Sequence, residues 1–249
     1  MLSYHDMSEP DEALFERQLR WVRKSWDIVD PTVFAAMVDG ELPVKRDSLL
    51  LTFDDGTVSN LHVAERVLRP LGIRALFFVV GRYALLSERD DWRAFAAKNI
   101  ILNRGPNEIP LNFQNMSIQD LRELLRAGHT IGAHTATHAR LSSLGGPQLH
   151  DEIVGGADLL EGHLKSAIQH FAYPFGDFNS ISAEASHIAR RRFKYVYTGM
   201  RGNNSGCRQT WSLWRDSNDP HDSLWYSGAC LEGGADFLYQ KNREICETW

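Results

Sequence analysis

The sequence predicts an α/β fold, a distorted or incomplete (β/α) barrel of parallel strands, as a single domain that spans residues 1–249. Short apolar runs alternate with amphipathic segments along most of the chain, a pattern that indicates parallel strands joined by helical crossovers. About six to eight such units in a chain of 249 residues fit a (β/α) barrel, and a doubly wound open sheet is the alternative. No GxGxxG or GxxxxGKS/T stretch follows an expected strand, so a nucleotide-binding open sheet has no support.

The first half of the chain contains start and stop signals for helices. The segment 30–40 begins with Asp30 as an N-cap and Pro31 in the first helical position, and it ends at Gly40. The run RALFFVV at 74–80 is apolar almost throughout, which predicts a strand that is buried on both faces. The elements expected in this half are a strand through residues 2–4, helices at 11–26, 30–40 and 60–72, and strands at 48–53 and 74–80.

Residues 82–116 interrupt this alternation, and we expect them to be an insertion or loop region of the same domain, with a helix over 87–99. After them, Ser117 and Asp120 have the pattern of a capping box, and Gly128 follows as a helix stop. The elements expected in this half are helices at 117–128, 147–166 (in spite of its glycines), 182–192 and 222–244, and strands at 129–134, 169–174, 194–199 and 208–215.

Composition and charge exclude several classes of function. The net charge is −5 and no basic block is longer than Arg190–Arg192, so the basic footprint of a nucleic-acid-binding protein is missing. The three cysteines (Cys207, Cys230 and Cys246) form no CxxC pair, which argues against a thiolate zinc site and a disulfide framework. The N-terminal segment lacks the pattern of a signal peptide, and no apolar stretch is long enough to cross a bilayer. We therefore expect a cytoplasmic protein with no stable membrane insertion, no nucleic-acid ligand and no evident protein partner.

Polar side chains follow several of the expected strands. Parallel barrels place their chemistry at the carboxyl ends of the strands, so these side chains should meet at one end of the sheet. An Asp-Gly turn would explain one carboxylate in the stretch TFDDG at 52–56, but it explains two adjacent carboxylates poorly. The titratable residues at expected strand ends are His5, Asp6, Asp54, Asp55, His134, His138, Arg215 and Asp216.

The spacing of His134 and His138 suits the capture of one metal ion. At positions i and i+4 of one helical turn, their Cβ atoms would lie roughly 5–6 Å apart on one face. Two imidazoles and one carboxylate make a three-ligand zinc site with an open position, and cobalt, nickel, manganese or iron are alternatives to zinc. Only one of two consecutive Asp side chains should point at the metal, which leaves the other free to act as a base.

The stretches TFDDG at 52–56, HTATH at 134–138 and YPFG at 173–176 resemble the motifs of the polysaccharide deacetylase family. Members of this family are metal-dependent N-deacetylases of amino-sugar polymers and oligosaccharides, and they have a distorted (β/α) barrel. The resemblance extends roughly from the SYHD stretch at 3–6 to the last expected helix. It implies hydrolysis of the acetamide of an N-acetylated amino sugar, within a surface polysaccharide or a nucleotide- or lipid-linked precursor, as in lipopolysaccharide biosynthesis.

The resemblance also assigns roles to single residues. It implies that Asp54 is the catalytic base and that Asp55, His134 and His138 bind the metal. The remaining roles that it implies are a hydrogen bond from Thr135 that braces the histidine loop, an oxyanion contact from the Phe175 amide N–H, and a fixed loop conformation from Pro174.

Two departures from the family pattern lead to further expectations. Many members have an Arg where this chain has Ala172, and we expect Arg215 to reach across to Asp54 instead; the alternative is a surface Arg215 paired with Asp216. The late Leu-x-His strand that supplies the general acid in the family is not visible. Because the first strand neighbours the last in a closed barrel, we expect His5 to fill this role, with His221 or catalysis by the metal without an acid as alternatives.

Two other functions stay open at this stage. One is the hydrolysis of a non-sugar amide or formamide, and the other is a catalytically degenerate barrel that binds carbohydrate without turnover.

Sugar rings often stack on aromatic side chains, but core or helix packing is the preferred interpretation of the aromatic residues near the C-terminus. These residues are Trp211, Trp214, Trp225 and Tyr226.

Overall fold

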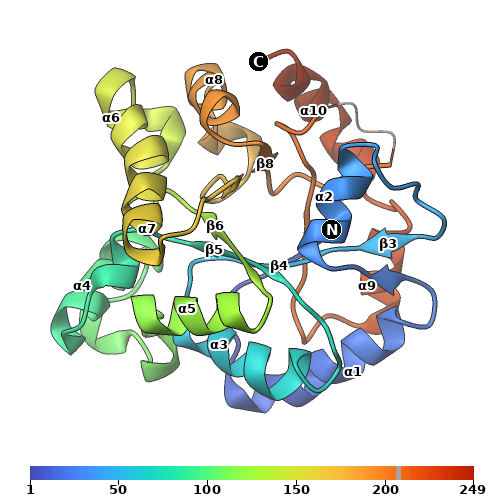
Figure 1. Ribbon diagram of the computed structural model, residues 1–249, viewed down its shortest axis with the longest axis horizontal. Helices are drawn as coiled ribbons and strands as arrows, with labels where there is room; N and C mark the ends of the chain where they lie inside the picture. Colours follow the sequence, from blue (N-terminus) through green and yellow to red (C-terminus); the bar gives the residue numbers. More distant parts are fainter. Residues whose placement is uncertain (206–208) are drawn as a thin grey trace.

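The computed structural model describes residues 1–205 and 209–249, and within these ranges seven parallel strands form one curved sheet (Figure 1). The strand order is β8-β7-β6-β5-β4-β1-β9, so neighbours in the sequence are mostly neighbours in the sheet. A second, separate pair joins β2 (Asp27–Ile28) to β3 (Ser48–Leu49). The strands of the main sheet are β1 Leu2–Tyr4, β4 Leu51–Phe53, β5 Leu76–Val79, β6 Thr130–Ala133, β7 His170–Ala172, β8 Tyr195–Tyr197 and β9 Asp216–Ser217.

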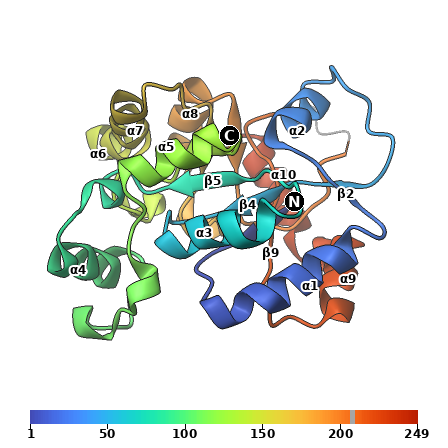
Figure 2. The same ribbon diagram turned by 60° about the horizontal axis from the view of Figure 1, so that its bottom comes forward.

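Helices surround this sheet in the order expected for a (β/α) barrel (Figures 1 and 2). In the part of the chain that the structure describes, two π-helical turns interrupt the helical layer: Ala64–Leu68 continues α3, and Asp151–Gly155 joins α6 to α7. The sequence prediction of a distorted (β/α) barrel is confirmed. The helices are α1 Glu12–Val22, α2 Pro31–Val38, α3 Val58–Val63, α4 Arg89–Asn99, α5 Ile118–Arg126, α6 Gly146–His150, α7 Gly156–Leu164, α8 Ala183–Arg192, α9 Leu224–Leu231 and α10 Gln240–Glu247.

The segment 210–218 closes the ring between the two edges of the sheet. Its first part bonds to β8, because the Leu213 N–H donates to the Val196 carbonyl at 2.8 Å. Its second part pairs with β1 in parallel, as expected for the first and last strands of a barrel. The regular strand predicted at 208–215 is wrong: residue 208 lies outside the described ranges, Leu213 forms an isolated bridge, and β9 begins only at Asp216. A segment that shares its hydrogen bonds between two edges cannot keep one continuous ladder.

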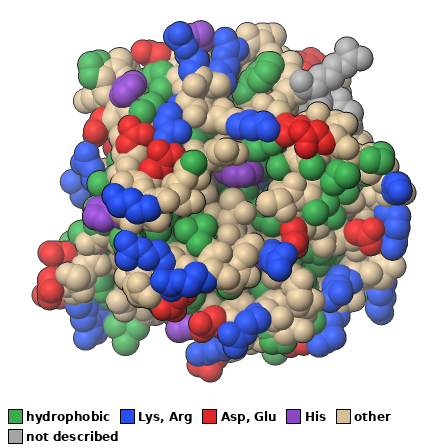
Figure 3. All heavy atoms as spheres, in the orientation of Figure 1, with side chains coloured by type: hydrophobic (Ala, Val, Ile, Leu, Met, Phe, Trp, Pro, Cys, Tyr) green, Lys and Arg blue, Asp and Glu red, His purple; other side chains and the backbone are tan. Residues whose placement is uncertain are grey.

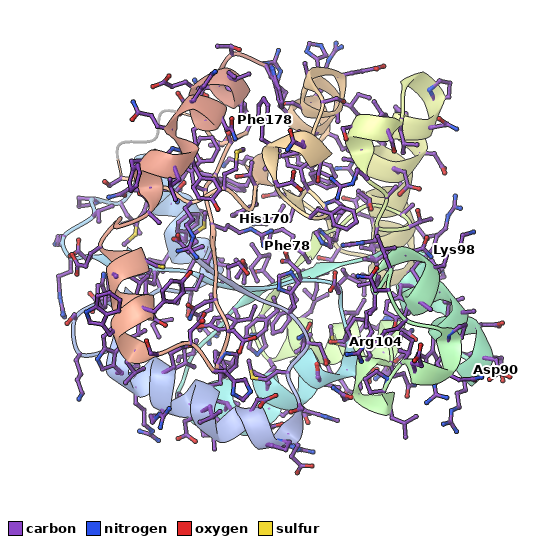
Figure 4. The ribbon with its side chains drawn as sticks, turned by 180° about the vertical axis from the view of Figure 1, so that it is seen from behind. Phe78, Asp90, Lys98, Arg104, His170 and Phe178 are labelled. Atoms are coloured by element: carbon purple, nitrogen blue, oxygen red, sulfur yellow. The ribbon has the colours of Figure 1, made fainter. Side chains whose placement is uncertain are left out.

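Successive side chains of each strand point alternately into the barrel and outward to the core beneath the helices. Phe78 of β5 packs inside with Tyr197 of β8, and Phe34 of α2 belongs to the same cluster. Phe53 and Phe77 face outward and belong to the larger cluster beneath the helices. β5 is buried along its whole length, as its apolar run predicted. In Figure 4, which views the molecule from behind, Phe78 and His170 lie near the middle of the ring of helices, whereas Asp90 and Lys98 lie at its edge.

Residues 82–116 pack around a small cluster of their own beside the barrel, with α4 on the outside (Figure 2). Trp92 and Ala96 of α4 meet Phe113 there, and the Tyr83 hydroxyl donates to the Phe113 carbonyl at 2.5 Å. The end of this segment is tied to the loop after β4, since the Met116 N–H donates to the Gly56 carbonyl at 2.8 Å. The segment therefore approaches the carboxyl end of the sheet.

The single closing helix predicted at 222–244 is wrong. Helix α9 ends at Leu231, a short 3₁₀ turn covers Asp236–Tyr239, and α10 begins at Gln240. The break falls at Gly233, whose φ is +80°, a left-handed conformation that ends a helix and that glycine adopts without steric cost.

Charges are mixed on the surface: on the face shown in Figure 3, Lys and Arg side chains are interspersed with Asp and Glu. Within the described residues, no helix combines the length and the apolar character that a bilayer span requires.

Candidate active site

The two adjacent carboxylates diverge because the backbone turns between them. Asp54 extends the ladder of β4, since its N–H donates to the Tyr4 carbonyl at 2.9 Å. Asp55 then has a φ of 72° and Gly56 a φ of 79°, so the chain leaves the sheet in a left-handed conformation. Both Asp side chains are buried, at 3% and 4% exposure. The turn explains Gly56, and the site described below accounts for the two carboxylates.

The loop with the two histidines is held in an irregular conformation. His134 continues the pairing of β6, because its N–H donates to the Val79 carbonyl at 2.9 Å. Thr135 and His138 then have φ values of 63° and 64°, so the prediction of a helical turn over this stretch is wrong. The Thr135 hydroxyl oxygen accepts a hydrogen bond from the His138 N–H at 2.9 Å, the brace that the resemblance implied. The loop brings the imidazoles together all the same, with ring centroids 5.1 Å apart.

Asp55, His134 and His138 form a buried cluster whose candidate ligand atoms all lie within 4.8 Å of one another. Oδ1 of Asp55 is 3.7 Å from Nε2 of His134 and 3.4 Å from Nε2 of His138. This oxygen is buried and, among the described residues, has no hydrogen-bond partner. An unpartnered buried carboxylate oxygen facing two imidazoles is costly by itself and is the donor set that a divalent cation binds. The residues present therefore fit a metal ion.

Backbone carbonyls orient both imidazoles towards Asp55. Nδ1 of His134 lies 2.8 Å from the Ala172 carbonyl oxygen, and Nδ1 of His138 lies 2.9 Å from that of Asn99. A carbonyl oxygen only accepts, so each Nδ1 carries a proton, and each Nε2 is the ring nitrogen that faces Asp55. Such outer partners fix the tautomer and the direction of a metal-binding His. Burial, opposed in part by the charge of Asp54, lowers the pKa of His134 to about 4, so this imidazole is neutral at pH 7.

Arg215 binds the Asp54 carboxylate with two parallel hydrogen bonds inside the barrel. Nη1 donates to Oδ1 at 2.6 Å and Nη2 donates to Oδ2 at 2.8 Å. Nη1 also donates to the Thr52 hydroxyl and Nε donates to the Thr198 carbonyl, and the guanidinium lies over the ring of Phe78. The side chain is 2% exposed, so its position is fixed on every side. The geometry is that of a bidentate, charge-assisted pair.

The alternative placement of Arg215 at the surface beside Asp216 is wrong. Asp216 lies near Arg201 instead, at 3.6 Å, and Arg215 precedes β9 rather than following a strand. Burial by itself raises the pKa of Asp54, but the charge of Arg215 and its hydrogen bonds outweigh this effect and hold the pKa below its usual range. Asp54 is therefore ionised at neutral pH.

His5 lies beside the same carboxylate, with Nε2 at 4.0 Å from Oδ2 of Asp54 and about half of its side chain exposed. His221, the alternative, is an exposed residue whose Nε2 pairs with Asp11 at 2.8 Å. Of the two histidines, His5 is the one that the structure places next to Asp54.

The loop after β7 completes the site. Phe175 has a φ of 63°, and its ring lies 4.8 Å from that of His138 and beneath the guanidinium of Arg140. Its N–H has no hydrogen-bond acceptor among the described residues. The next residue must be glycine, because a Cβ at Gly176 would lie 2.4 Å from the Gly199 nitrogen. Pro174, the residue before Phe175, is buried.

Backbone strain is concentrated here. Non-glycine residues with positive φ are rare and costly, and they cluster at functional sites. Within residues 1–205 and 209–249 there are five, and four of them belong to the three loops above: Asp55, Thr135, His138 and Phe175.

Several contacts at the site could not be predicted from the sequence. The carbonyls of Asn99 and Ala172 carry no sequence signal, because every residue has one. Asp6 was noted at a strand end, but it accepts a hydrogen bond from Asn112 only because the 82–116 segment folds back onto this end of the sheet. For Trp225 the expected helix packing is wrong, since it is 81% exposed.

Comparison with known proteins identifies the family of this chain. A family model described as Polysaccharide deacetylase matches residues 41–191, more than half of the chain. Among curated proteins, YxkH of Bacillus subtilis (strain 168), named for the same family, is 21% identical over 192 residues. The alignment covers 75% of this chain and 60% of YxkH, so the chain spans about three fifths of the length of that relative.

Two solved structures share the fold at low sequence identity. The Streptococcus pyogenes deacetylase PplD, in complex with acetate, has a TM-score of 0.69 and 21% identity, covering 92% of this chain and 96% of that chain. IcaB from Ammonifex degensii has a TM-score of 0.71 and 23% identity, covering 93% and 95%. At these identities the likeness establishes the fold alone.

The matched region 41–191 contains TFDDG, HTATH and YPFG, the three stretches whose loops form the buried cluster and its strained surroundings. The chain therefore belongs to the polysaccharide deacetylase family.

Proposed function

We propose that this protein is a metal-dependent N-deacetylase that removes the acetyl group from a GlcNAc-type amino sugar. The substrate class is a surface polysaccharide, such as lipopolysaccharide, or its nucleotide- or lipid-linked precursor, and the proposed compartment is the cytoplasm. One observation carries the proposal: Asp55, His134 and His138 converge within 4.8 Å, next to an Asp54 that is ionised and held by Arg215. Family membership supports it, and so does the acetate in the PplD structure, since acetate is what such a reaction releases.

Asp55, His134 and His138 would hold one divalent cation, zinc first and cobalt, nickel, manganese or iron as alternatives. When bound there, the cation supplies Lewis acidity that polarises the acetyl carbonyl and lowers the pKa of water. Oδ1 of Asp55 and the two Nε2 atoms are the ligand atoms, because each Nδ1 is occupied by a backbone carbonyl.

The remaining residues would orient the reaction and move its protons. Asp54 takes a proton from the attacking water, and Arg215 keeps this carboxylate ionised and fixed in direction. The N–H of Phe175, which has no acceptor in the part of the chain that the structure describes, donates to the oxyanion that develops on the acetyl group. His5, close to Asp54 and open to solvent, gives a proton to the amine that leaves.

His5→Ala is expected to lower turnover roughly 10²–10⁴-fold, the usual contribution of a general acid. Zn²⁺ affinity should stay at the wild-type value, since His5 is not among the ligands. The measurement is kcat for acetate release together with a Zn²⁺ titration. His221→Ala is the matched control, an exposed His paired with Asp11, and it should leave both quantities unchanged. Near-normal turnover of His5→Ala would remove His5 from the mechanism.

The main experiment joins metal analysis to product identification. The purified chain is stripped with a chelator, reloaded with Zn²⁺, Co²⁺, Ni²⁺, Mn²⁺ or Fe²⁺ in turn, and assayed on N-acetylated glycans and nucleotide sugars. Acetate release that depends on the added cation is the expected result. Release of formate or ammonia from non-sugar amides would instead identify the protein as a hydrolase of non-sugar amides or formamides. Sugar binding without release of any product would contradict the proposed reaction.

A further inference from the structure

A buried carboxylate outside the metal cluster holds the loop that carries the two histidines. Glu152 is 8% exposed and belongs to the π-helical turn Asp151–Gly155. Its Oε2 accepts a hydrogen bond from the Thr137 N–H at 2.9 Å, and its Oε1 accepts one from the Thr137 hydroxyl at 2.7 Å. Both carboxylate oxygens are thus bonded to the residue directly before His138.

The π-helical turn frees a further acceptor for the same loop. In an α-helix the Glu152 carbonyl would accept from the N–H of residue 156. Here the Gly156 N–H donates to the Asp151 carbonyl instead, and the Glu152 carbonyl accepts from the Ala136 N–H at 2.9 Å. Turns of this kind often occur at functional sites, where they present groups that a regular helix would use internally.

Gly156 lets the helix approach the loop closely enough for these bonds. A Cβ at Gly156 would lie 2.5 Å from the Ala136 nitrogen and 2.6 Å from the Thr135 carbonyl carbon. On the other side, the chain after β5 bonds to the loop, since Gly81 N–H donates to the Thr135 carbonyl and Arg82 N–H to that of Ala136, both at 2.9 Å. The histidine loop is therefore clamped between the end of β5 and the π-helical turn.

We propose that Glu152 is a positioning residue for metal binding: its carboxylate and its freed carbonyl hold the 135–138 loop, in which Thr135 and His138 are left-handed, so that both imidazoles face Asp55. The positive φ values of Thr135 and His138 cost of order 1–3 kcal/mol each, so they persist only where surrounding bonds impose them. Glu152 acts through Ala136 and Thr137 and is no ligand itself. The inference rests on the proposed function only for the location of the cation.

The test compares Glu152→Ala with Glu152→Gln in the full chain. A glutamine amide accepts from the Thr137 N–H and donates to the Thr137 hydroxyl, so it preserves both bonds without the charge. We expect Glu152→Ala to weaken Zn²⁺ affinity, measured by competition with a chromogenic chelator, roughly 10–100-fold, the effect of losing an outer hydrogen-bond partner. Glu152→Gln should stay within about threefold of the wild type, because both bonds remain.

A second readout needs no cation. In the metal-free protein, the Thr137 amide proton should exchange faster with solvent in Glu152→Ala and at the wild-type rate in Glu152→Gln, as measured by NMR. Unchanged exchange or unchanged Zn²⁺ affinity in folded Glu152→Ala would overturn the proposal, and so would a Glu152→Gln variant as weak as Glu152→Ala. A wild-type chain with a protected Thr137 amide that binds no Zn²⁺ would contradict the proposed function instead.

Two variants separate positioning from general stability. Thr137→Val removes the 2.7 Å hydroxyl bond alone and should weaken Zn²⁺ affinity roughly 2–10-fold, the worth of one hydrogen bond; an unchanged affinity would also count against the proposal. Thr137→Val therefore tests the proposal even if Glu152→Ala does not fold.

Glu161→Ala is the matched control, on helix α7 that continues the π-helical turn. Glu161 likewise accepts from a loop amide, that of Ile168 at 2.6 Å, but away from the histidines. It should lower the unfolding temperature and leave Zn²⁺ affinity unchanged.

Discussion

Replacing Asp55 by Asn is expected to weaken cation binding by more than the roughly 100-fold that loss of an outer hydrogen-bond partner can cause, and to abolish turnover with it. Asn keeps the size of the side chain and tolerates the φ of 72° at this position. What it loses is the negative charge that faces the Nε2 atoms of His134 and His138. Calorimetric titration of Zn²⁺ into chelator-stripped protein, with acetate release in parallel, measures both effects.

The same variant should not lose stability in its metal-free form. Oδ1 of Asp55 is buried and has no hydrogen-bond partner among the described residues, and burying an unpaired charge costs free energy. The unfolding temperature of metal-free Asp55→Asn is therefore expected to equal or exceed that of the metal-free wild type. A clear decrease would show that the carboxylate stabilises the fold itself.

The identical chemical change one position earlier provides the matched comparison. Asp54→Asn should lower turnover roughly 10²–10⁴-fold, the range for loss of a general base, while Zn²⁺ affinity changes little. If Asp54→Asn lost the cation and Asp55→Asn retained it, the roles of the two carboxylates would be exchanged.

Arg215→Met is expected to cause the largest loss of stability, about 3–5 kcal/mol, which is typical when one partner of a buried ion pair is removed. The Asp54 carboxylate would stay buried without the two hydrogen bonds that now hold it. Turnover should fall as well, because the base would lose its orientation. Urea unfolding of the metal-free proteins and kcat of the reloaded proteins are the measurements.

The pH dependence of Arg215→Met has a definite sign. In the wild type the pKa of Asp54 is below its usual range, so the stabilisation is present above the unfolded pKa and is lost as the pH falls through the folded pKa. Without Arg215, burial raises the pKa of Asp54 above its wild-type value. The difference in unfolding free energy between the wild type and Arg215→Met should therefore be largest at neutral pH and shrink as the pH falls. The acid limb of the kcat/KM profile of Arg215→Met should lie at higher pH than that of the wild type.

Arg20→Met is the control for the loss of an Arg. Arg20 pairs with Glu16 on the exposed face of α1 at 2.6 Å, and such surface pairs contribute about 0.2–1 kcal/mol. If Arg215→Met lowered the free energy of unfolding no more than Arg20→Met does, the buried pair would not stabilise the fold.

The sequence was sufficient for the features that short-range patterns encode. The apolar run at 74–80 identified a doubly buried strand, and Pro31 and Ser117 marked helix starts close to the observed ones. Asp54 and His134 follow strands, and parallel strands share one carboxyl end, so their proximity could be expected. The sequence pattern gave a wrong prediction where one spacing is compatible with two backbone conformations. The i, i+4 spacing of His134 and His138 predicted a helical turn, but Thr135 and His138 adopt left-handed conformations in an irregular loop.

What the sequence by itself determined is the alternation of strands and helices and the end of the sheet at which Asp54, Asp55, His134 and His138 appear. The tertiary structure decided between the two placements of Arg215: it reaches Asp54 across 161 positions, as expected, because the segment 210–218 closes the ring. It also decided that carbonyls of Asn99, Ala172 and Glu152 fix the histidine loop. The physical reason is that periodicity and turn preference act over a few residues, whereas a backbone carbonyl is the same in every residue and becomes specific only through its position in space.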